Sequence, residues 1–444
     1  MKNKLLPLLI IFILSACDNS APPKQDISFE NCLFEKIQAC KGDEDCKVIA
    51  ARICEVETNA RGVLAQSTDK IKKQQLQIAS LERAALQGAE KNAELQALRE
   101  ELERLKSIVS DTNNYKWNMV TTWPKNYPGL GRAAENLSKY VDEMSNGRLK
   151  IKVYGAGEMV PAMEVFDAVS RGAAQLGHGA SYYWTGKLKS SQFYTAVPFG
   201  LTAQEINSWI HWGGGQELWE EAYAPFNLIP FAGGNTGVQM AGWFKKEINS
   251  LDDLKGLKMR IPGLAGEIFS RAGAETVLLP GSDIFLALQQ GVIDAAEWVG
   301  PFNDLTFGFH QVADYYYYPG WHEGGSTLEI IINKDAYSSL PDDLKAIVKY
   351  AARAVNQEML DEYTANNNRA LTELVEVHGV ELRKLPDDVL IELRRISEEV
   401  MEEFIKDDEM ATKIYNSYQA FKQDVIQYHE ISEKAFIEMR DLEE

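Results

Sequence analysis

The feature that most restricts the fold of this chain is an alternation of strand-like and helix-like segments in the middle of the sequence. Residues 116–122 and 149–153 have the composition of strands, and residues 130–144 and 161–170 have the amphipathic pattern of helices. The alternation continues to about residue 340. A helix after each strand is typical of an α/β protein with a mostly parallel sheet.

Beyond that point the pattern becomes almost wholly helical. Residues 341–378 and 386–444 are rich in Glu, Lys, Leu and Ala, so we expect long C-terminal helices there. In the last of them, apolar residues recur at intervals of four and three, which is typical of a coiled-coil seam and predicts a homodimer contact. The seam consists of Ile414, Tyr418, Phe421, Val425 and Tyr428.

Residues 1–16 have the composition of a bacterial lipoprotein signal peptide. Two lysines precede an apolar run, residues 5–13, which is too short for an ordinary transmembrane helix. The Leu-Ser-Ala-Cys sequence that ends at Cys17 resembles a lipobox, which implies that Cys17 is lipidated; a simple secretory peptide is the alternative. Asp18 resembles an inner-membrane retention signal. We therefore expect a periplasmic, membrane-anchored protein with a polar tether over residues 17–30.

The other four cysteines lie in residues 31–57, which we interpret as a helical module. They are separated by seven, five and seven residues, and two antiparallel helices would join them as nested disulfides. Disulfides suit an oxidising compartment. A zinc site is the alternative, although the sequence lacks the usual Cys-x-x-Cys spacing. The predicted pairs are Cys32 with Cys54 and Cys40 with Cys46.

Residues 62–110 contain no proline, and their interior is interrupted only by Gly88. Apolar residues recur at intervals of seven before this glycine and of three and four after it, which indicates a coiled coil. A single helix of about 49 residues would extend roughly 70 Å and act as a spacer. A helix that lies on the main domain is the alternative.

Charge and motifs exclude several classes of protein. The 444 residues carry a formal net charge of −19, which argues against nucleic acid binding. No nucleophile elbow, Walker loop, His-Glu-x-x-His or dinucleotide fingerprint occurs, and no cysteine follows Cys54, so we do not predict an enzyme. His178 and His322 could line a cleft, but a structural role is the simpler interpretation of both.

Four short segments between residues 233 and 325 place polar residues among glycines, prolines and aromatic residues. Arg260 ends a strand-like run, and Pro262-Gly263 and a helical pattern follow it. Open α/β sheets hold ligands at such strand–turn–helix junctions, and an arginine there can bind a carboxylate through two parallel hydrogen bonds. Glu297 and Glu323 lie in similar loops and could hold a hard cation or perform acid–base chemistry. Helix capping or pairing with lysine is the alternative for both.

These segments resemble a known family. Residues 115–444 are similar to the solute-binding receptors of TRAP transporters (tripartite ATP-independent periplasmic transporters), most of all to the branch that binds 2-oxo and 2-hydroxy monocarboxylates with a metal ion. The resemblance implies a two-lobed α/β fold of the periplasmic-binding-protein type with a long C-terminal helix, here preceded by an all-α extension. The motifs are TTWPKNYPG (121–129), GHGASYYW (177–184), GGNTGVQMAGWF (233–244), LKMRIPGLAGE (257–267), AAEWVGPFND (295–304) and YYPGWHEGG (317–325).

The resemblance also implies roles for the substrate-binding residues. Arg260 corresponds to the arginine that binds the substrate carboxylate, and Tyr183 is expected to hydrogen-bond a substrate oxygen. Gln239 is expected to contact both substrate and metal, with Asn235 as a weaker candidate on the same loop. The ring of Trp298 is expected to form one wall of the site, with core packing as the alternative.

The metal that the resemblance implies is calcium or sodium. Its expected ligands are the carboxylates of Glu297 and Glu323, the amide of Gln239 and the backbone carbonyl of Trp298. The chain is therefore predicted to be a receptor that captures a pyruvate- or lactate-like acid and delivers it to TRAP permease subunits. A ligand-sensing receptor for a membrane signalling partner is the main alternative, and an enzyme acting on a carboxylate or a structural envelope protein remains open.

Overall fold

The computed structural model of this protein describes residues 69–78, 96–101 and 114–442. The chain divides into two units at Thr112, and each is considered separately. The predicted signal peptide, tether and cysteine module, including Cys17 and both predicted disulfides, lie outside the described residues and stay predictions.

Both described stretches of the first unit are helical. Lys70 Nζ lies 3.4 Å from the Glu101 carboxylate, although 31 residues separate them. The coiled coil predicted for residues 62–110 falls mostly outside the described residues and stays a prediction.

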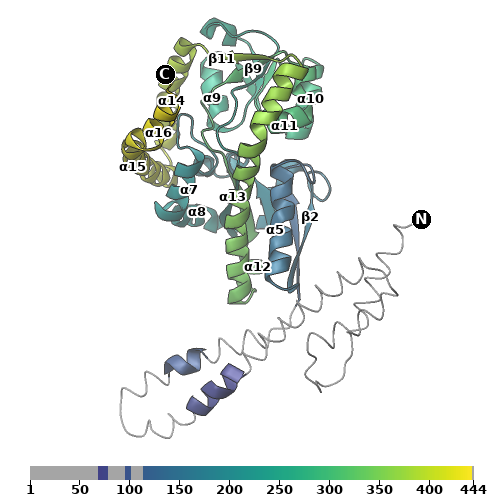
Figure 1. Cartoon of the computed structure of the whole chain (residues 1–444), viewed down its shortest axis with the longest axis vertical. Helices are drawn as coiled ribbons and strands as arrows, with labels where there is room; N and C mark the ends of the chain where they lie inside the picture. The colour runs from purple at the N-terminus through teal and green to yellow at the C-terminus, as the bar shows by residue number, and fades with distance from the viewer. Residues whose placement is uncertain (1–68, 79–95, 102–113, 443–444) are drawn as a thin grey trace, which may run out of the picture. The chain divides into compact units, whose positions relative to one another are not determined.

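Residues 114–442 form two α/β lobes, each built around its own sheet (Figure 1). The first lobe has a five-stranded sheet in the order β2-β1-β3-β10-β4. Its strands are β1 (Tyr115–Thr121), β2 (Leu149–Tyr154), β3 (Leu176–Gly179), β4 (Leu228–Asn235) and β10 (Thr327–Asn333). Its helices are α5 (Leu130–Met144), α6 (Val165–Ser170), α7 (Ala203–Trp212), α8 (Gly215–Tyr223) and α12 (Lys334–Ser338), with the 3₁₀ turns η2 (Ala162–Glu164), η3 (Ser181–Trp184), η4 (Lys189–Tyr194) and η5 (Ala224–Phe226).

Helix α5 illustrates how the sequence determines a local element. It follows Gly129, whose φ of 63° lies in the left-handed region, and a Cβ at this glycine would clash with the ring of Tyr363. Ala133, Leu137 and Val141 recur at intervals of four and are buried on one face of the helix. The predicted bounds of this helix, residues 130–144, are confirmed.

The second lobe has a six-stranded sheet in the order β11-β9-β5-β8-β6-β7. Its strands are β5 (Gly242–Phe244), β6 (Lys258–Arg260), β7 (Glu275–Val277), β8 (Ala295–Ala296), β9 (Tyr315–Tyr318) and β11 (Glu381–Lys384). Its helices are α9 (Gly263–Arg271), α10 (Gly281–Gln289) and α11 (Pro301–Phe307), with the 3₁₀ turns η6 (Leu251–Leu254) and η7 (Phe309–Gln311).

Both sheets are mostly parallel, as predicted, but each contains one reversed strand. Among the described strands, β10 is antiparallel to both of its neighbours in the first sheet, and β5 is antiparallel to both of its neighbours in the second. Each of these strands is the first that the chain forms after it crosses from the other lobe. The chain therefore enters the sheet without the helical crossover that makes successive strands parallel.

The two-lobed fold with long C-terminal helices is confirmed, and one of these helices serves both lobes. Helix α13 (Asp342–Thr372) has 31 residues and packs against β4 and α5 of the first lobe and against α11 of the second. Figure 1 shows it running beside both lobes. A short π-helical turn, η8 (Glu373–Val377), leads to β11, which lies between the two stretches predicted to be helical, residues 341–378 and 386–444.

The last helices contact both lobes. Helix α14 (Asp387–Ile405) packs on α9 of the second lobe, and α15 (Glu409–Ile431) packs on η4, α7 and α8 of the first before α16 (Glu433–Arg440). The first two residues of the predicted seam, Ile414 and Tyr418, are fully buried and pack within this chain. Tyr428, by contrast, is 63% exposed. No helix among residues 69–78, 96–101 and 114–442 is long and apolar enough to span a membrane.

Candidate ligand and metal site

The predicted ligand residues meet where the two lobes face each other. Arg260 is the last residue of β6, and Glu297 directly follows the neighbouring strand β8. Both side chains are fully buried, and Arg260 Nη1 donates to Glu297 Oε2 at 3.0 Å and to the Glu297 carbonyl at 2.8 Å. The parallel pairing of β6 and β8 thus places a cation and an anion at the carboxyl ends of adjacent strands.

The guanidinium of Arg260 keeps one nitrogen for a ligand. Its Nε donates to the Leu279 carbonyl at 3.2 Å, and its Nη1 is occupied by Glu297. Nη2 is buried and has no hydrogen-bond partner within the described part of the chain. Two of the three guanidinium nitrogens are therefore already used, so Arg260 does not offer a free pair of nitrogens for the two parallel hydrogen bonds expected from the sequence. Of the three guanidinium nitrogens, only Nη2, with its two hydrogens, is left to donate to a ligand.

Arg260 satisfies only one of the two carboxyl oxygens of Glu297. The other oxygen, Oε1, is buried and finds no hydrogen-bond partner among the described residues. Burial raises the pKa of Glu297 to about 8, although the charge of Arg260 opposes this effect. A buried carboxylate of this kind is stabilised by a cation at its free oxygen.

Two loops that connect the lobes hold Gln239 and Glu323 together. The backbone N–H of Gln239 donates to the Glu323 carbonyl at 3.1 Å. The amide Nε2 of Gln239 donates to Thr236 Oγ1 at 3.1 Å and to Ser326 Oγ at 3.2 Å. Ser326 Oγ in turn donates to Glu323 Oε2. Because both amide hydrogens are used, the orientation of the amide is fixed, and Gln239 Oε1 is left without a partner among residues 69–78, 96–101 and 114–442.

These residues fit a metal ion. One ligand atom each from Glu297, His322 and Glu323 lies within 4.8 Å of the others, and all three residues are buried. Burial and, to a smaller extent, the nearby charge of Glu297 raise the pKa of Glu323 to about 7. Two buried carboxylates that repel each other, together with a free amide oxygen, form the oxygen-rich set that hard cations bind.

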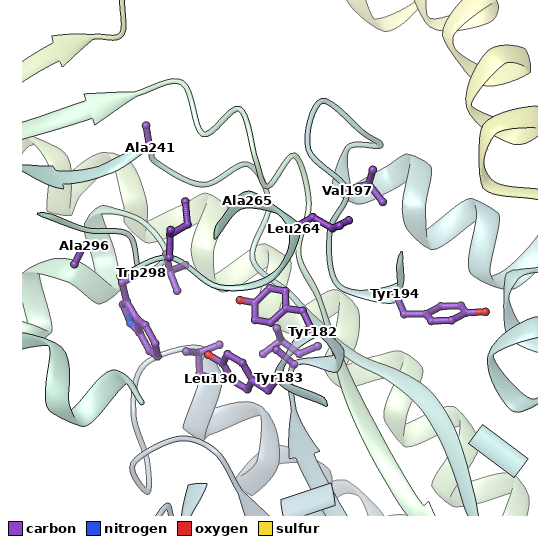
Figure 2. Packing of buried hydrophobic residues seen from close by; sticks show 14 of the residues in the cluster. Leu130, Tyr182, Tyr183, Tyr194, Val197, Ala241, Leu264, Ala265, Ala296 and Trp298 are labelled. Atoms are coloured by element: carbon purple, nitrogen blue, oxygen red, sulfur yellow. The ribbon is translucent and has the colours of Figure 1, made fainter. Parts of the chain in front are cut away.

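Aromatic side chains from the first lobe complete the site. Tyr183 comes from η3, and burial raises its pKa to about 12, so its hydroxyl is neutral and can donate a hydrogen bond. Figure 2 shows the hydroxyls of Tyr182 and Tyr183 on the side of their rings that faces Trp298. The ring of Trp123 lies 6.0 Å from that of Tyr183 and 6.2 Å from that of Trp298.

The ring of Trp298 contacts Arg260 and also packs in the core. Its ring lies 5.2 Å from the Arg260 guanidinium, which is a cation–π distance. A Cβ at Gly281 would overlap the same ring, so α10 packs closely on its other side. Its Nε1 donates to the Tyr127 hydroxyl of the first lobe at 3.3 Å. The two interpretations of this tryptophan are therefore compatible.

Two of the residues that the sequence singled out have structural partners. His178 Nδ1 accepts from Trp123 Nε1 at 2.7 Å, and its Nε2 lies 3.0 Å from the Gly233 carbonyl, so the structural interpretation holds. The Asn235 amide donates to Thr327 Oγ1, and its Oδ1 accepts from the Gly237 N–H. Asn235 thus stabilises the loop that carries Gln239. Both ends of its amide group are already hydrogen-bonded within the chain.

The sequence did not identify the residues that support the site. Glu329 on β10 accepts hydrogen bonds from Ser181, Trp184 and Tyr223, which anchors the turn that carries Tyr183. Asp304 likewise accepts from Trp243, Tyr316 and the backbone N–H groups of Val299 and Gly300, which fixes the segment after Glu297. Asp304 is the last residue of the motif AAEWVGPFND (295–304). Its hydrogen-bond donors, however, can be identified only from the structure.

A buried charged site enclosed by two α/β lobes defines a solute-binding receptor of the periplasmic-binding type. Consistent with this class, the family model described as "Bacterial extracellular solute-binding protein, family 7" matches residues 119–408. The chain belongs to this family.

Proteins of known description are similar over most of the chain. A monocarboxylate 2-oxoacid-binding periplasmic protein of Nostoc sp. is 43% identical over 330 residues, which is 74% of this chain and 90% of that protein. A TRAP periplasmic solute-binding protein from Colwellia psychrerythraea, with bound calcium and pyruvate, has a TM-score of 0.72 and 42% identity and covers 73% of this chain and 99% of that one. Another, from Pseudoalteromonas atlantica with bound sodium and pyruvate, also has a TM-score of 0.72 and 42% identity and covers 74% and 100%.

Proposed function

We propose that this protein is the extracytoplasmic receptor of a TRAP transporter and binds a small 2-oxo or 2-hydroxy monocarboxylate together with calcium or sodium. The observation that carries this proposal is the set of buried, unpaired polar atoms at the lobe junction. Among the described residues they include Arg260 Nη2, Glu297 Oε1 and Gln239 Oε1. One donor and two acceptors suit an anionic ligand bound beside a cation.

Some residues of the site bind the acid, and others bind the cation. Arg260 Nη2 binds the carboxylate of the acid, and the neutral Tyr183 hydroxyl donates to one of its oxygens. Glu297, Glu323, Gln239 and the Trp298 carbonyl would hold the cation, which supplies positive charge to the carboxylate and the 2-oxygen when bound. Because a simple acid such as acetate has no 2-oxygen, we expect the site to discriminate against it.

Metal removal tests this proposal. Calorimetric titration of the purified protein should show pyruvate or lactate binding in the presence of calcium or sodium, and acetate should bind more weakly. A chelator combined with a sodium-free buffer should abolish binding, because cation and acid stabilise each other in one site. The acid released on denaturation should be chemically unchanged. Equal pyruvate affinity with and without the cation, or no binding of any of these acids, would contradict the proposal.

Contacts between the lobes support delivery by closure. The Tyr127 hydroxyl of the first lobe donates to the Asn303 carbonyl of the second at 2.7 Å, and Asn303 Nδ2 returns a bond to the Pro128 carbonyl at 2.8 Å. A ligand between the lobes stabilises this closed arrangement. We infer that the TRAP permease distinguishes the closed receptor from the open one.

The lipid anchor proposed at Cys17 has its own test. Cys17→Ala should move the protein from the membrane fraction to the soluble periplasm, because a protein that lacks the acylated cysteine loses its membrane affinity. Fractionation followed by immunodetection measures this, with Cys32→Ala as a control that keeps the anchor. A Cys17→Ala protein that remains in the membrane fraction would contradict lipidation at this residue.

The proposed homodimer is supported by exposed apolar side chains at the end of the chain. These side chains are more than 40% exposed on α15, on α16 and just beyond it, where they do not contribute to the core. A second copy would cover such a surface, although only Tyr428 among these residues belongs to the predicted seam. They are Tyr428, Ile431, Phe436, Ile437, Met439 and Leu442.

A further inference from the structure

His322 differs from the other fully buried histidine of the described chain. Its side chain is 1% exposed, and both Nδ1 and Nε2 have no hydrogen-bond partner within the described residues. His178 is equally buried, but Trp123 and the Gly233 carbonyl satisfy its two nitrogens. A buried polar atom without a partner destabilises the fold, because it has lost its hydrogen bonds to water and gained none within the protein. A histidine held only for packing would therefore be expected to have partners, as His178 has.

The unpaired ring points into the proposed cation site. His322 Nε2 lies 3.7 Å from Glu297 Oε1, which is itself unpaired among the described residues. This separation suits two adjacent ligands of one metal ion whose bonds are about 2.0–2.2 Å long.

We propose that His322 is a further ligand of the cation, so that the site offers nitrogen as well as oxygen. This inference rests on the proposed function, because it adds a residue to the same site. Calcium and sodium favour oxygen ligands, whereas imidazole suits divalent transition metals. The mixed set of Glu297, Glu323, Gln239 and His322 therefore binds Mn²⁺ and Co²⁺ more tightly than Ca²⁺, while the oxygen ligands still allow calcium to bind.

Metal titration of the full chain tests this inference. Protein stripped of metal with a chelator would be titrated with Mn²⁺, Co²⁺ and Ca²⁺ in the presence of pyruvate. His322→Gln replaces the nitrogen by an amide oxygen at similar reach. This variant should lose at least about tenfold in affinity for Mn²⁺ and Co²⁺ and less than about threefold for Ca²⁺. Pulsed electron paramagnetic resonance of bound Mn²⁺ should show ¹⁴N modulation in the wild type and none in His322→Gln.

A surface histidine pair provides the matched control. The rings of His310 and His378 lie 4.2 Å apart, and His378 Nε2 is 3.7 Å from Glu373, so transition metals could bind there adventitiously. His310→Gln removes this pair and should leave both the tight Mn²⁺ affinity and the ¹⁴N signal unchanged.

Three outcomes would overturn the inference: no ¹⁴N modulation in wild-type protein, modulation that persists in His322→Gln, or weaker Mn²⁺ than Ca²⁺ binding. The wild-type spectrum and the wild-type affinities decide the question even if His322→Gln does not fold. Calcium-dependent pyruvate binding is measured on the same samples. If it is present while the nitrogen signal is absent, His322 is not a ligand and the proposed function stands; if pyruvate does not bind with any cation, the proposed function itself fails.

Discussion

Arg260→Ala is expected to weaken pyruvate binding more than any other single substitution in the site. Nη2 of this residue is the unpaired cationic donor that faces the proposed carboxylate position. Truncating one partner of a buried, charge-assisted pair costs about 2–5 kcal/mol, which corresponds to roughly 30-fold to several thousand-fold in affinity. Isothermal titration with pyruvate in saturating calcium measures the loss.

Two further arginine variants separate ligand binding from stability. Arg260→Ala also leaves the buried Glu297 without its ion-pair partner, so thermal melting must show that the variant is folded. Arg260→Lys keeps the charge but loses the planar guanidinium, and it should bind pyruvate weakly as well. Arg271→Ala breaks only surface pairs with Glu267 and Glu403 and should change affinity by less than about threefold. A folded Arg260→Ala protein with wild-type affinity would reject the assigned role.

Glu297→Gln is expected to reduce cation and pyruvate affinity together. The substitution removes a negative charge from the proposed cation ligands, and the Gln oxygen would still accept from Arg260 Nη1 as Glu297 Oε2 does. The amide nitrogen then takes the place of the free Oε1 and faces the cation. We expect each affinity to fall by at least about tenfold, and by the same factor where the two ligands are coupled, because coupling between sites is reciprocal.

The measurement for Glu297→Gln is a pair of titrations, calcium at fixed pyruvate and pyruvate at fixed calcium. Glu358→Gln is the matched control, since Glu358 is a half-buried glutamate on α13 that hydrogen-bonds Asn136 and Tyr140 of the first lobe. It should leave both titrations unchanged. If Glu297→Gln weakens pyruvate but not calcium, the cation is bound elsewhere.

The elements with strong local patterns could be predicted from the sequence. The helix predicted over residues 130–144 has those bounds, and the strand predicted over 149–153 is one residue longer. Strand direction was not predictable in the same way. Whether β5 and β10 run parallel or antiparallel depends on where the chain crosses between lobes, and no periodicity within the strand records that crossing.

For the site, too, the sequence indicated which residues take part but not which hydrogen bonds they form. Glycine- and aromatic-rich loops indicated Arg260, Glu297 and Gln239, and the structure brings these three to one junction. Which of their atoms remain free depends on neighbours that are distant in sequence, such as Ser326 for Gln239, 87 residues away. For the same reason the sequence could not distinguish His322 from His178, since their difference lies entirely in their partners.

The path of the chain through the lobes also affects how this part of the protein unfolds. The chain forms β1 to β4 in the first lobe, β5 to β9 in the second, β10 in the first again and β11 in the second, so neither lobe is a continuous stretch of sequence. Helix α13 contributes Met359 and Tyr363 to a core cluster that includes residues of both sheets. Opening one lobe would expose apolar surface of the other, so the two lobes form one cooperative unit rather than two independent folding domains. A ligand bound at the junction consequently stabilises both lobes against unfolding, including strands that it does not contact.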